Sequence, residues 1–278
     1  MKLVKLSLLI LISLTLSFCL YGYYQNRSLD VEYQTIALDD LPQELDQLKI
    51  VHVSDTHFER NRISIETLLS EIEQAQPDLI FLTGDLIDRT ADLSNVPLEE
   101  FGRSLSALAP TYAVSGNHET SSGQLDEWDQ DINQSGVNLL NNEQITIEFN
   151  DAQLALVGVK DEDYPIDVPT INPITDIPVL LLAHHPEYFE DYLTSNPLIE
   201  PDITFSGHAH GGQIRIPLIG PMYAPGQGFF PKYTTGIYNS EVDPSKKLVV
   251  SRGIGNSLFP FRINNKPHLL VITLERTK

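Results

Sequence analysis

The sequence predicts an α/β fold, and three observations support this prediction. Short apolar runs typical of buried strands alternate with longer amphipathic runs typical of helices. Five of the strand-like runs end in a polar cluster, and sites in α/β folds form beyond the carboxyl ends of strands. Composition shows no break between residues 45 and 278, and there is no internal repeat. We therefore expect one domain, at residues 48–278, behind two N-terminal segments.

The first N-terminal segment, residues 1–24, is long enough to cross a membrane. Lys2 and Lys5 precede an apolar run of roughly 18–20 residues, close to the length of a bilayer-spanning helix. A cleaved signal peptide is the alternative, but no small residues at cleavage spacing follow, and bulky Phe18 precedes Cys19. We expect an uncleaved, single-pass anchor in the cell membrane. The lysines should stay cytoplasmic, which places the domain on the extracytoplasmic side.

The charge of the chain argues against nucleic acid as a partner. The net charge is -20, and subtracting the two leader lysines leaves -22 on residues 25–278. Binding to a phosphate backbone needs basic patches, so we expect no nucleic-acid partner. Metal ions could still supply the positive charge that binds a phosphate ester. The one cysteine, Cys19, permits no disulfide framework.

Residues 25–47 are polar and acidic, and we expect them to form a linker. The domain should then begin with three strands, each followed by a polar loop and a helical segment. We expect these strands at residues 48–53, 79–82 and 111–114. We expect the helices at residues 63–75, 98–108 and 124–134. In the first helix Ile65, Leu68 and Ile72 share one face, and Pro77 ends it.

The second half of the domain should begin with a β-hairpin. Residues 145–149 and 154–158 have strand character and flank the turn signal Asn150-Asp151. A buried strand and a short helix should follow, at residues 178–183 and 187–193. The last strands are expected to begin at residues 203, 247 and 268, the final two covering residues 247–250 and 268–275.

The loop after the strand at residue 203 carries two histidines between glycines, Gly207-His208-Ala209-His210-Gly211. Neutral imidazole is the commonest metal ligand, and glycine lets the backbone approach a ligand closely. In an extended segment residues i and i+2 point the same way, so we expect His208 and His210 to face one point. A polar loop with two histidines by chance is the alternative.

The polar loops together offer carboxylate, amide and imidazole groups. This mixture suits manganese, iron or zinc, and the lack of thiolate argues against a structural zinc site. Each loop alone has another interpretation, because aspartates cap helices and asparagine favours turns. Two further histidines, His52 and His268, are expected to be structural. The candidate ligands are Asp55, His57, Asp85, Asn117, His118, His184, His185, His208 and His210.

Five motifs occur in order along the chain: Asp55-x-His57, Gly84-Asp85-x-x-Asp88-Arg89, Gly116-Asn117-His118-Glu119, His184-x-Pro186 and Gly207-His208-x-His210. As a set they resemble the motifs of the calcineurin-like metallophosphoesterases, over roughly residues 48–275. The resemblance implies a four-layer sandwich in which two mainly mixed β-sheets are flanked by helices. It also implies a hydrolase that cleaves phosphoester bonds.

The resemblance implies two divalent metal ions, for which manganese is favoured and iron or zinc are alternatives. Asp85 would bridge the ions, and a hydroxide between them would attack phosphorus in line. The His-x-Pro spacing favours His184 over His185 as a ligand. One ion would be held by Asp55, His57 and His210, and the other by Asn117, His184 and His208.

The resemblance gives three neighbouring residues catalytic roles without metal ligation. His118 would face the scissile phosphate, as a general acid or as a stabiliser of charge on the leaving oxygen. Asp88 would orient His118, as carboxylates orient imidazoles in metal sites. Arg89 would donate to a phosphate oxygen.

Further segments resemble one branch of the family, the bacterial membrane-associated phosphodiesterases of the YkuE/YaeI type. These segments are residues 211–214, 223–228 and 251–257, together with the anchor. We therefore expect a phosphodiester or pyrophosphate substrate that is lipid-linked or belongs to the cell envelope. The alternatives are a UDP-2,3-diacylglucosamine pyrophosphatase of lipid A synthesis and a non-catalytic metal-binding membrane protein.

An aromatic segment, residues 226–233, follows the histidine loop. Its Phe229, Phe230 and Tyr233, with Lys232 beside them, could meet the tails and head group of a lipid. A buried aromatic loop that packs on the sheet is the alternative.

Overall fold

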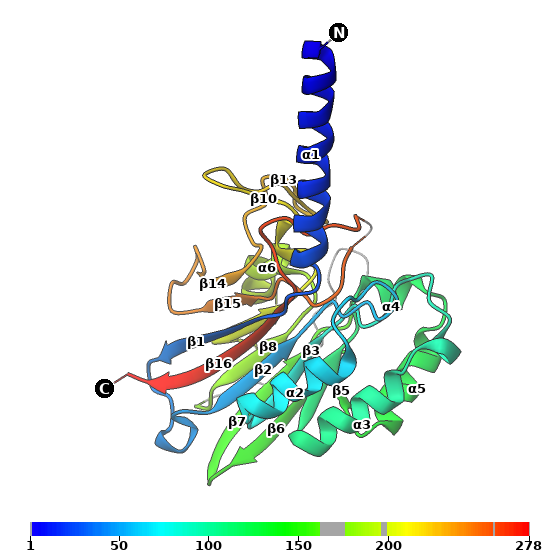
Figure 1. The fold of residues 1–278 in the computed structure, drawn as a ribbon. Coiled ribbons are helices and arrows are strands. Elements are labelled where there is room, and N and C mark those ends of the chain that lie inside the picture. Colours follow the sequence, from blue (N-terminus) through cyan, green and yellow to red (C-terminus); the bar gives the residue numbers. More distant parts are fainter. Residues whose placement is uncertain (1, 162–175, 196–198, 258, 278) are drawn as a thin grey trace.

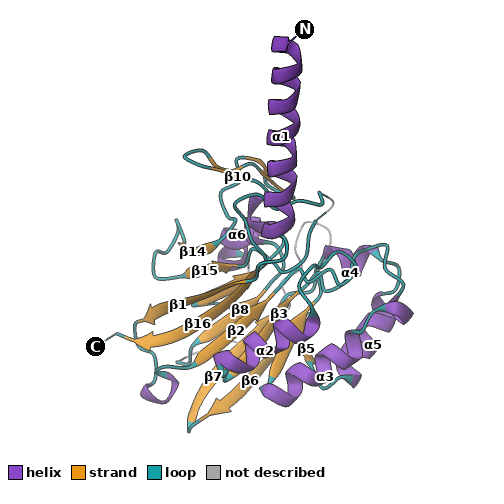
Figure 2. Ribbon diagram, viewed as in Figure 1, coloured by secondary structure: helices purple, strands orange, loops and turns teal. Residues whose placement is uncertain are grey.

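The computed structural model describes residues 2–161, 176–195, 199–257 and 259–277. Two six-stranded sheets pack face to face, and helices cover their outer faces (Figure 1, Figure 2). The resulting order is helices, sheet, sheet, helix, as expected from the sequence. Both sheets are mixed, which confirms the fold class.

The first sheet has the strand order β1-β16-β2-β3-β4-β5. Strands β2 to β5 run parallel, β16 is antiparallel to β2, and β1 is parallel to β16. The carboxyl ends of β2, β3 and β4 therefore lie at one edge. The bounds are β1 Asp30–Leu38, β16 His268–Arg276, β2 Lys49–Val53, β3 Leu79–Thr83, β4 Thr111–Val114 and β5 Asn138–Leu139.

The second sheet has the strand order β14-β15-β9-β8-β7-β6. Its four central strands, β15, β9, β8 and β7, run parallel, and each edge strand is antiparallel to its neighbour. Strands β6 and β7 form the hairpin expected around Asn150. The bounds are β14 Gly236–Asn239, β15 Lys247–Val250, β9 Ile203–Ser206, β8 Val179–Leu182, β7 Ala152–Gly158 and β6 Glu143–Phe149.

Three amphipathic helices cover the first sheet and one short helix covers the second. Helix α2 begins after Ser64, whose side chain accepts a hydrogen bond from the Thr67 N–H at 3.2 Å and caps the first turn. The bounds are α2 Ile65–Ala75, α3 Leu98–Leu108, α5 Leu125–Gln134 and α6 Phe189–Thr194. Short 3-10 helices lie at Gln43–Leu45, Leu93–Asn95, Pro186–Tyr188 and His210–Gly212.

The hydrophobic core lies between the layers. Trp128 of α5 and Phe101 of α3 are fully buried against β2 and β3. The interface between the two sheets contains Phe81 of β3 and Phe205 of β9, whose rings meet edge to face at 5.1 Å. A packed interior of this kind fixes the strand ends rigidly, which matters for the polar loops that follow them.

Two small hairpins leave the sheets after the histidine loop. They pair β10 Arg215–Ile216 with β11 Gly220–Pro221, and β12 Tyr223–Ala224 with β13 Gly228–Phe229. These hairpins lie on the same side of the body as the N-terminal helix (Figure 1). Within the aromatic segment Tyr233 is buried, whereas Phe229 and Phe230 are exposed. Of the aromatic residues in this segment, only Tyr233 therefore fits the alternative of a buried loop.

The expectation of a linker is wrong for part of residues 25–47. Strand β1 pairs with β16 along nine residue pairs and forms the edge of the first sheet. Its sequence looks polar because β1 is an edge strand in which only Ile36 and Leu38 are buried hydrophobics and the other residues are partly or fully exposed. The folded body therefore begins at residue 30.

The N-terminal helix α1, Lys2–Gln25, projects from the body (Figure 1). Its segment Val4–Gln25 is long and apolar enough to cross a membrane, with a mean hydropathy of 2.0. The helix ends against the body, since Gln25 and Asn26 are buried there.

An ion-pair cluster fastens β1 to the rest of the body. Glu32 on β1 lies 3.0 Å from Nε2 of His268 and 3.3 Å from Nη1 of Arg252. The hydrogen bond from His268 is the main reason that the pKa of Glu32 falls from 4.5 to about 2. His268 is thus structural, as expected.

We predict that Glu32→Gln destabilises the fold at neutral pH. The Glu32 side chain is 34% exposed, so solvent screening limits its contribution to the free energy of unfolding to about 1 kcal/mol. Because the folded-state pKa is lowered, this contribution is present above pH 4.5 and is lost as the pH falls toward 2. Denaturant unfolding followed by Trp128 fluorescence checks this, with Glu148→Gln on exposed β6 as the control. Equal destabilisation at pH 7 and pH 2 would refute the assignment.

Candidate metal centre

Five polar loops meet at one place in the structure. The loops follow β2, β3, β4, β8 and β9, as the sequence predicts. They are joined by backbone hydrogen bonds: Asp55 N–H donates to Gly84 O at 3.0 Å, His57 N–H donates to Asp85 O at 3.1 Å, and Gly207 N–H donates to His184 O at 3.1 Å. Residues far apart in the chain thus share one buried pocket.

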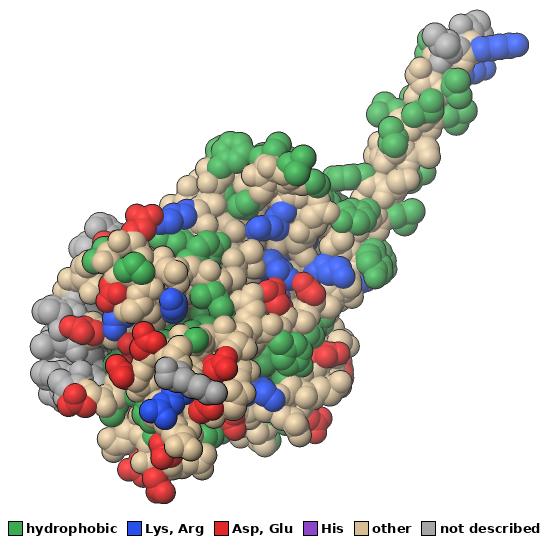
Figure 3. Space-filling view, turned by 90° about the vertical axis from the view of Figure 1, so that its left-hand side faces the viewer, with side chains coloured by type: hydrophobic (Ala, Val, Ile, Leu, Met, Phe, Trp, Pro, Cys, Tyr) green, Lys and Arg blue, Asp and Glu red, His purple; other side chains and the backbone are tan. Residues whose placement is uncertain are grey.

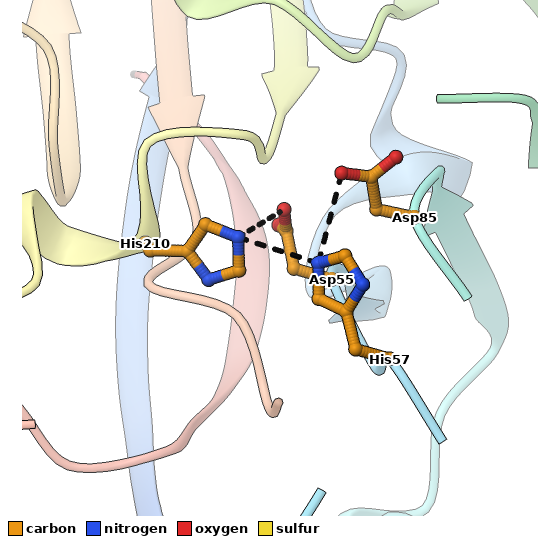
Figure 4. A group of neighbouring side chains, drawn as sticks. All are labelled: Asp55, His57, Asp85 and His210. Atoms are coloured by element: carbon orange, nitrogen blue, oxygen red, sulfur yellow. Dashed lines mark hydrogen bonds and ion pairs between the residues drawn. The ribbon is translucent and has the colours of Figure 1, made fainter. Parts of the chain in front are cut away.

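The first group of side chains in this pocket comprises Asp55, His57, Asp85 and His210 (Figure 4). Nε2 of His57 lies 3.3 Å from Nε2 of His210 and 3.7 Å from Oδ2 of Asp85. Nε2 of His210 lies 3.4 Å from Oδ1 of Asp55. All four side chains are buried. Their ligand atoms therefore face a common point.

The second group comprises Asp85, Asn117, His184 and His208. Nε2 of His184 lies 3.2 Å from Oδ2 of Asp85 and 3.2 Å from Oδ1 of Asn117. Nδ1 of His208 also lies 3.2 Å from Nε2 of His184. Asn117 begins the short helix α4, Asn117–Ser121. The geometry thus brings His184 into the pocket.

His185 takes a different position. Its Nε2 lies 2.6 Å from Oδ1 of Asp161, and its Nδ1 lies 3.1 Å from Oε1 of Glu187. His52 is also outside the group, since its Nε2 lies 2.8 Å from Oγ1 of Thr83. These positions agree with the preference for His184 and with a structural role for His52.

Asp85 lies between the two groups. Its Oδ2 is the atom near both His57 and His184, while its Oδ1 accepts the backbone N–H of His118 at 2.8 Å. The single oxygen Oδ2 therefore lies near imidazoles of both groups. This is the position that a bridging ligand requires.

The donor atoms fit a pair of divalent cations. Nδ1 of His184 is 2.7 Å from Thr83 O, and Nδ1 of His57 is 3.2 Å from Ile87 O, so each Nδ1–H donates to a carbonyl. Burial lowers the pKa of His57 to about 4, so this ring stays neutral and the lone pair on its Nε2 faces the Asp85 carboxylate, an acceptor that meets an acceptor. A cation resolves this conflict, and backbone carbonyls commonly fix metal-ligating imidazoles in this way.

Burial shifts the pKa values of the ionisable groups in the pocket. Burial raises the pKa of Asp55 to about 6. Burial opposes charge on His184, but the carboxylates of Asp85, Asp55 and Asp161 together outweigh burial and raise the pKa of His184 well above its ordinary value. Burial lowers the pKa of His208 and of His210, so these rings stay neutral and available as ligands.

The backbone of the pocket is strained at the candidate ligands. Non-glycine residues in the left-handed region are uncommon, and such strain gathers at functional sites. The positive φ angles are 49° for Asp55, 39° for His57, 54° for Asp85, 64° for His208 and 46° for His210. The expected extended geometry of the histidine loop is therefore wrong. Because the loop turns, His208 and His210 enter different groups instead of facing one point.

Glycines allow the loops to pack this closely. A Cβ at Gly116 would overlap the Asp85 carboxylate, and a Cβ at Gly207 would overlap the side chains of Ser54 and Asp55. Any side chain at these positions would displace a candidate ligand.

His118, Asp88 and Arg89 lie together at the wall of the pocket. Nδ1 of His118 accepts the backbone N–H of Arg89 at 3.0 Å and lies 3.3 Å from Oδ2 of Asp88. Asp88 also pairs with Arg60 at 2.9 Å, so its carboxylate is shared. Burial lowers the pKa of His118, against the opposing effect of Asp85 and Asp88. Arg89 is one of the residues that line the cavity.

Two buried residues support the pocket and were not predicted from the sequence. Glu119 accepts the backbone N–H groups of Asp85 and Gly116, each at 2.8 Å, and that of Ile87 at 3.1 Å. Burial raises the pKa of Glu119 to about 8. Arg262 is fully buried and lies 3.5 Å from Nδ1 of His210. Glu119 could have been predicted from its position directly after His118 in the sequence. No local sequence pattern marks Arg262.

Comparison with known proteins agrees with this geometry. A family model described as calcineurin-like phosphoesterase matches residues 48–212. The chain belongs to this family. It is therefore a metal-dependent phosphoesterase, whose buried aspartate and histidine cluster could hold a metal pair.

Relatives of this phosphoesterase cover most of its length. An uncharacterized metallophosphoesterase, YkuE of Bacillus subtilis, is 28% identical over 92% of this chain and 90% of its own. Phosphodiesterase YaeI of Escherichia coli is 29% identical over 81% of this chain and 82% of its own. A transmembrane protein with metallophosphoesterase domain from Danio rerio is 26% identical over 89% of this chain and 57% of its own.

We predict that Asp85→Asn impairs binding of both metal ions, because one oxygen serves both groups. Metal analysis of the purified phosphoesterase after equilibration with Mn²⁺ measures this directly. Asp161→Asn, which removes a buried carboxylate outside both groups, is the matched control and should retain its metal. Unchanged metal stoichiometry in Asp85→Asn would disprove bridging.

Proposed function

We propose that the protein is a phosphodiesterase or pyrophosphatase that acts on a lipid-linked or cell-envelope substrate. The observation that carries this proposal is the position of Asp85 Oδ2 between two imidazole groups, with the ring of His118 packed on that of His57 at a centroid distance of 4.6 Å. Aspartate and imidazole ligands suit two divalent ions, of which manganese is our choice. The name of the relative YaeI, a phosphodiesterase, favours a diester substrate.

A cavity of about 250 Å³ opens over the metal ligands and is large enough for a phosphodiester group. Metal ligands form its floor, and Tyr223, Pro225, Ser257 and Phe259 form part of its wall. A phosphate in this cavity would lie against His118 and Arg89. The aromatic wall favours a substrate whose alcohol groups are partly apolar.

Two bound divalent ions would polarise the phosphoryl oxygens and supply an acidified water as the nucleophile. Asp55, His57 and His210 would hold one ion, and Asn117, His184 and His208 would hold the other. Asp85 would hold both. His208 and His210 are uncharged imidazoles, which suits them as metal ligands. The strained loops hold their ring nitrogens toward the pocket.

His118 is our proposed general acid. Because its Nδ1 accepts the Arg89 N–H, the proton of the neutral ring is on Nε2. Nε2–H can then donate to the leaving oxygen. Proton transfer itself requires the charged ring. Nδ1 takes up a proton from solvent beside the Asp88 carboxylate, 3.3 Å away, and Nε2 then gives its proton to the leaving oxygen, which leaves the ring neutral.

Arg89 has a second proposed role through its side chain. Arg89 is among the residues that line the cavity, and its guanidinium could donate two parallel hydrogen bonds to phosphate oxygens. It would offset negative charge on those oxygens in the transition state.

We also propose that α1 anchors the protein in the cell membrane with the domain on the extracytoplasmic side. Lys2 and Lys5 are the only charges before residue 25, and positive residues stay cytoplasmic. The name of the Danio rerio relative, a transmembrane protein, supports membrane attachment. A cell-envelope substrate is consistent with this topology. A protease-protection assay that finds the C-terminus in the cytoplasm would overturn it.

We predict that His118→Ala lowers kcat by on the order of 10²–10⁴-fold, the usual contribution of general acid–base catalysis. The metal content should not change, since His118 donates through Nε2 to substrate and is no ligand. Steady-state kinetics combined with metal analysis checks both parts. Loss of metal in His118→Ala, or wild-type turnover with metal retained, would contradict the proposed role.

The class of function is tested with soluble substrates. The full-length protein in detergent should hydrolyse bis(p-nitrophenyl) phosphate with Mn²⁺ and lose this activity in a chelator. It should prefer this diester to p-nitrophenyl phosphate. A protein that binds two ions but hydrolyses neither ester would be a non-catalytic metal-binding protein, and the proposal would fail.

A further inference from the structure

Six large apolar side chains form an exposed surface on the hairpins and on the segment 259–265 near the foot of α1. We call this surface the apolar collar, and its members are Leu218, Ile219, Phe229, Phe230, Phe259 and Phe261. Their exposed fractions run from 39% for Phe261 to 108% for Leu218. Isolated apolar residues are common on soluble proteins, but a contiguous group of aromatic and aliphatic side chains marks an interaction site.

The backbone at the collar is strained as well as exposed. Leu218 has φ of 69° and Phe230 has φ of 54°, in the left-handed region that non-glycine residues seldom occupy. In both residues the strained backbone carries an apolar side chain out into solvent. Backbone strain of this kind at an exposed apolar hairpin tip indicates that the tip functions by contacting a partner.

The collar is continuous with the wall of the catalytic cavity. Tyr223 lines the cavity, and its ring packs on Phe229 of the collar at a centroid distance of 5.5 Å. Phe259 also lines the cavity and packs on Phe261 at 6.0 Å. The apolar surface therefore extends from the rim of the cavity outward on two sides.

The collar is also continuous with the foot of α1. A Cβ at Gly22 would touch the ring of Phe261 at 3.4 Å, and Tyr21 donates to Oδ1 of Asn264 at 2.5 Å. The backbone N–H of Arg262 donates to Oδ1 of buried Asn26 at 3.2 Å. These contacts fix the direction in which α1 leaves the body.

Two views place the collar hairpins beside α1. In Figure 1, β10 and β13 lie on the side of the body from which α1 projects. In Figure 3, which is turned by 90°, hydrophobic side chains gather on that same side of the body, toward the helix. A bilayer that contains α1 would therefore meet the collar.

Basic side chains lie next to the collar. A second small cavity is lined by Arg60, Arg62, Asn256, Ser257 and Pro260 and shares Ser257 with the catalytic cavity. Pro260 stands between the two collar phenylalanines Phe259 and Phe261. Arg60 is paired with Asp88, so the exposed Arg62 supplies the local positive charge where anionic head groups would lie on this otherwise acidic domain.

We propose that the apolar collar inserts into the interfacial region of the bilayer that holds α1, so that the catalytic cavity opens at the membrane surface. Aromatic and aliphatic side chains favour this interface, and a second contact beside α1 sets the orientation of the body. The substrate is then a lipid with a phosphodiester head group that enters the cavity from the bilayer. This substrate class rests on the proposed phosphodiesterase function, whereas collar insertion does not.

Collar insertion is tested without any measurement of activity. The full-length protein, with Cys19→Ser, is spin-labelled at Leu218→Cys or Phe230→Cys and reconstituted into phosphatidylethanolamine–phosphatidylglycerol vesicles. Val242→Cys is the control, because Val242 is an exposed apolar residue outside the collar. Labels at residues 218 and 230 should be relaxed more by oxygen than by a water-soluble nickel chelate, and the label at 242 should show the reverse. Collar labels that behave like the label at 242 would overturn the proposal.

The substrate class is tested with the double variant Leu218→Asp/Phe230→Asp, whose residues do not line the cavity. Hydrolysis of a phospholipid with a fluorescent phosphodiester head group in vesicles should fall by about tenfold or more, because charged tips leave the interface. Hydrolysis of soluble bis(p-nitrophenyl) phosphate should stay at the wild-type rate, as it should for Val242→Asp with both substrates.

The outcomes separate the two proposals. A wild-type protein that cleaves the soluble diester but not the vesicle lipid, or a double variant that cleaves the vesicle lipid at the wild-type rate, would overturn the lipid substrate. A wild-type protein that cleaves neither diester would refute the proposed function, while the spin-label result would still decide collar insertion.

Discussion

The structure depends on one constraint, which is the burial of the Asp85 carboxylate between two sets of imidazoles. Burial of an isolated charge there would raise the free energy of the folded state, and fixed hydrogen-bond partners offset this penalty. The backbone N–H of His118 holds one oxygen of Asp85, and Glu119 holds the turn through the N–H of Asp85 itself. The other oxygen is left for cations. The left-handed backbone at Asp55, His57, Asp85, His208 and His210, and the glycines beside them, follow from the need to bring these groups together.

Much of the fold could be predicted from the sequence because local patterns agree with the final packing. Helix α3 has the predicted bounds, and β3 and β4 differ from the predicted strands by at most one residue. Strand β1 was missed because an edge strand with only two buried side chains has no clear apolar pattern. The candidate ligands were found because aspartate and histidine motifs follow strand ends. Arg262 was missed because its relation to His210 arises only from tertiary structure, across 52 residues of chain.

The same segment contacts the candidate metal pocket and helix α1. Residues near Phe261 pack on α1, Arg262 contacts His210, and Asn265 donates to the carbonyl of His210 at 2.7 Å. Helix α1 is therefore connected to the pocket through a few side chains. This connection also relates the exposed phenylalanines to the cavity they adjoin.

Anomalous diffraction from crystals grown with Mn²⁺ tests the central claim most directly. We predict two manganese peaks in the pocket, one on each side of Oδ2 of Asp85. One peak should contact Asp55, His57 and His210, and the other should contact Asn117, His184 and His208. A single peak, or two peaks that do not share Asp85, would contradict the claim that this carboxylate organises a metal pair.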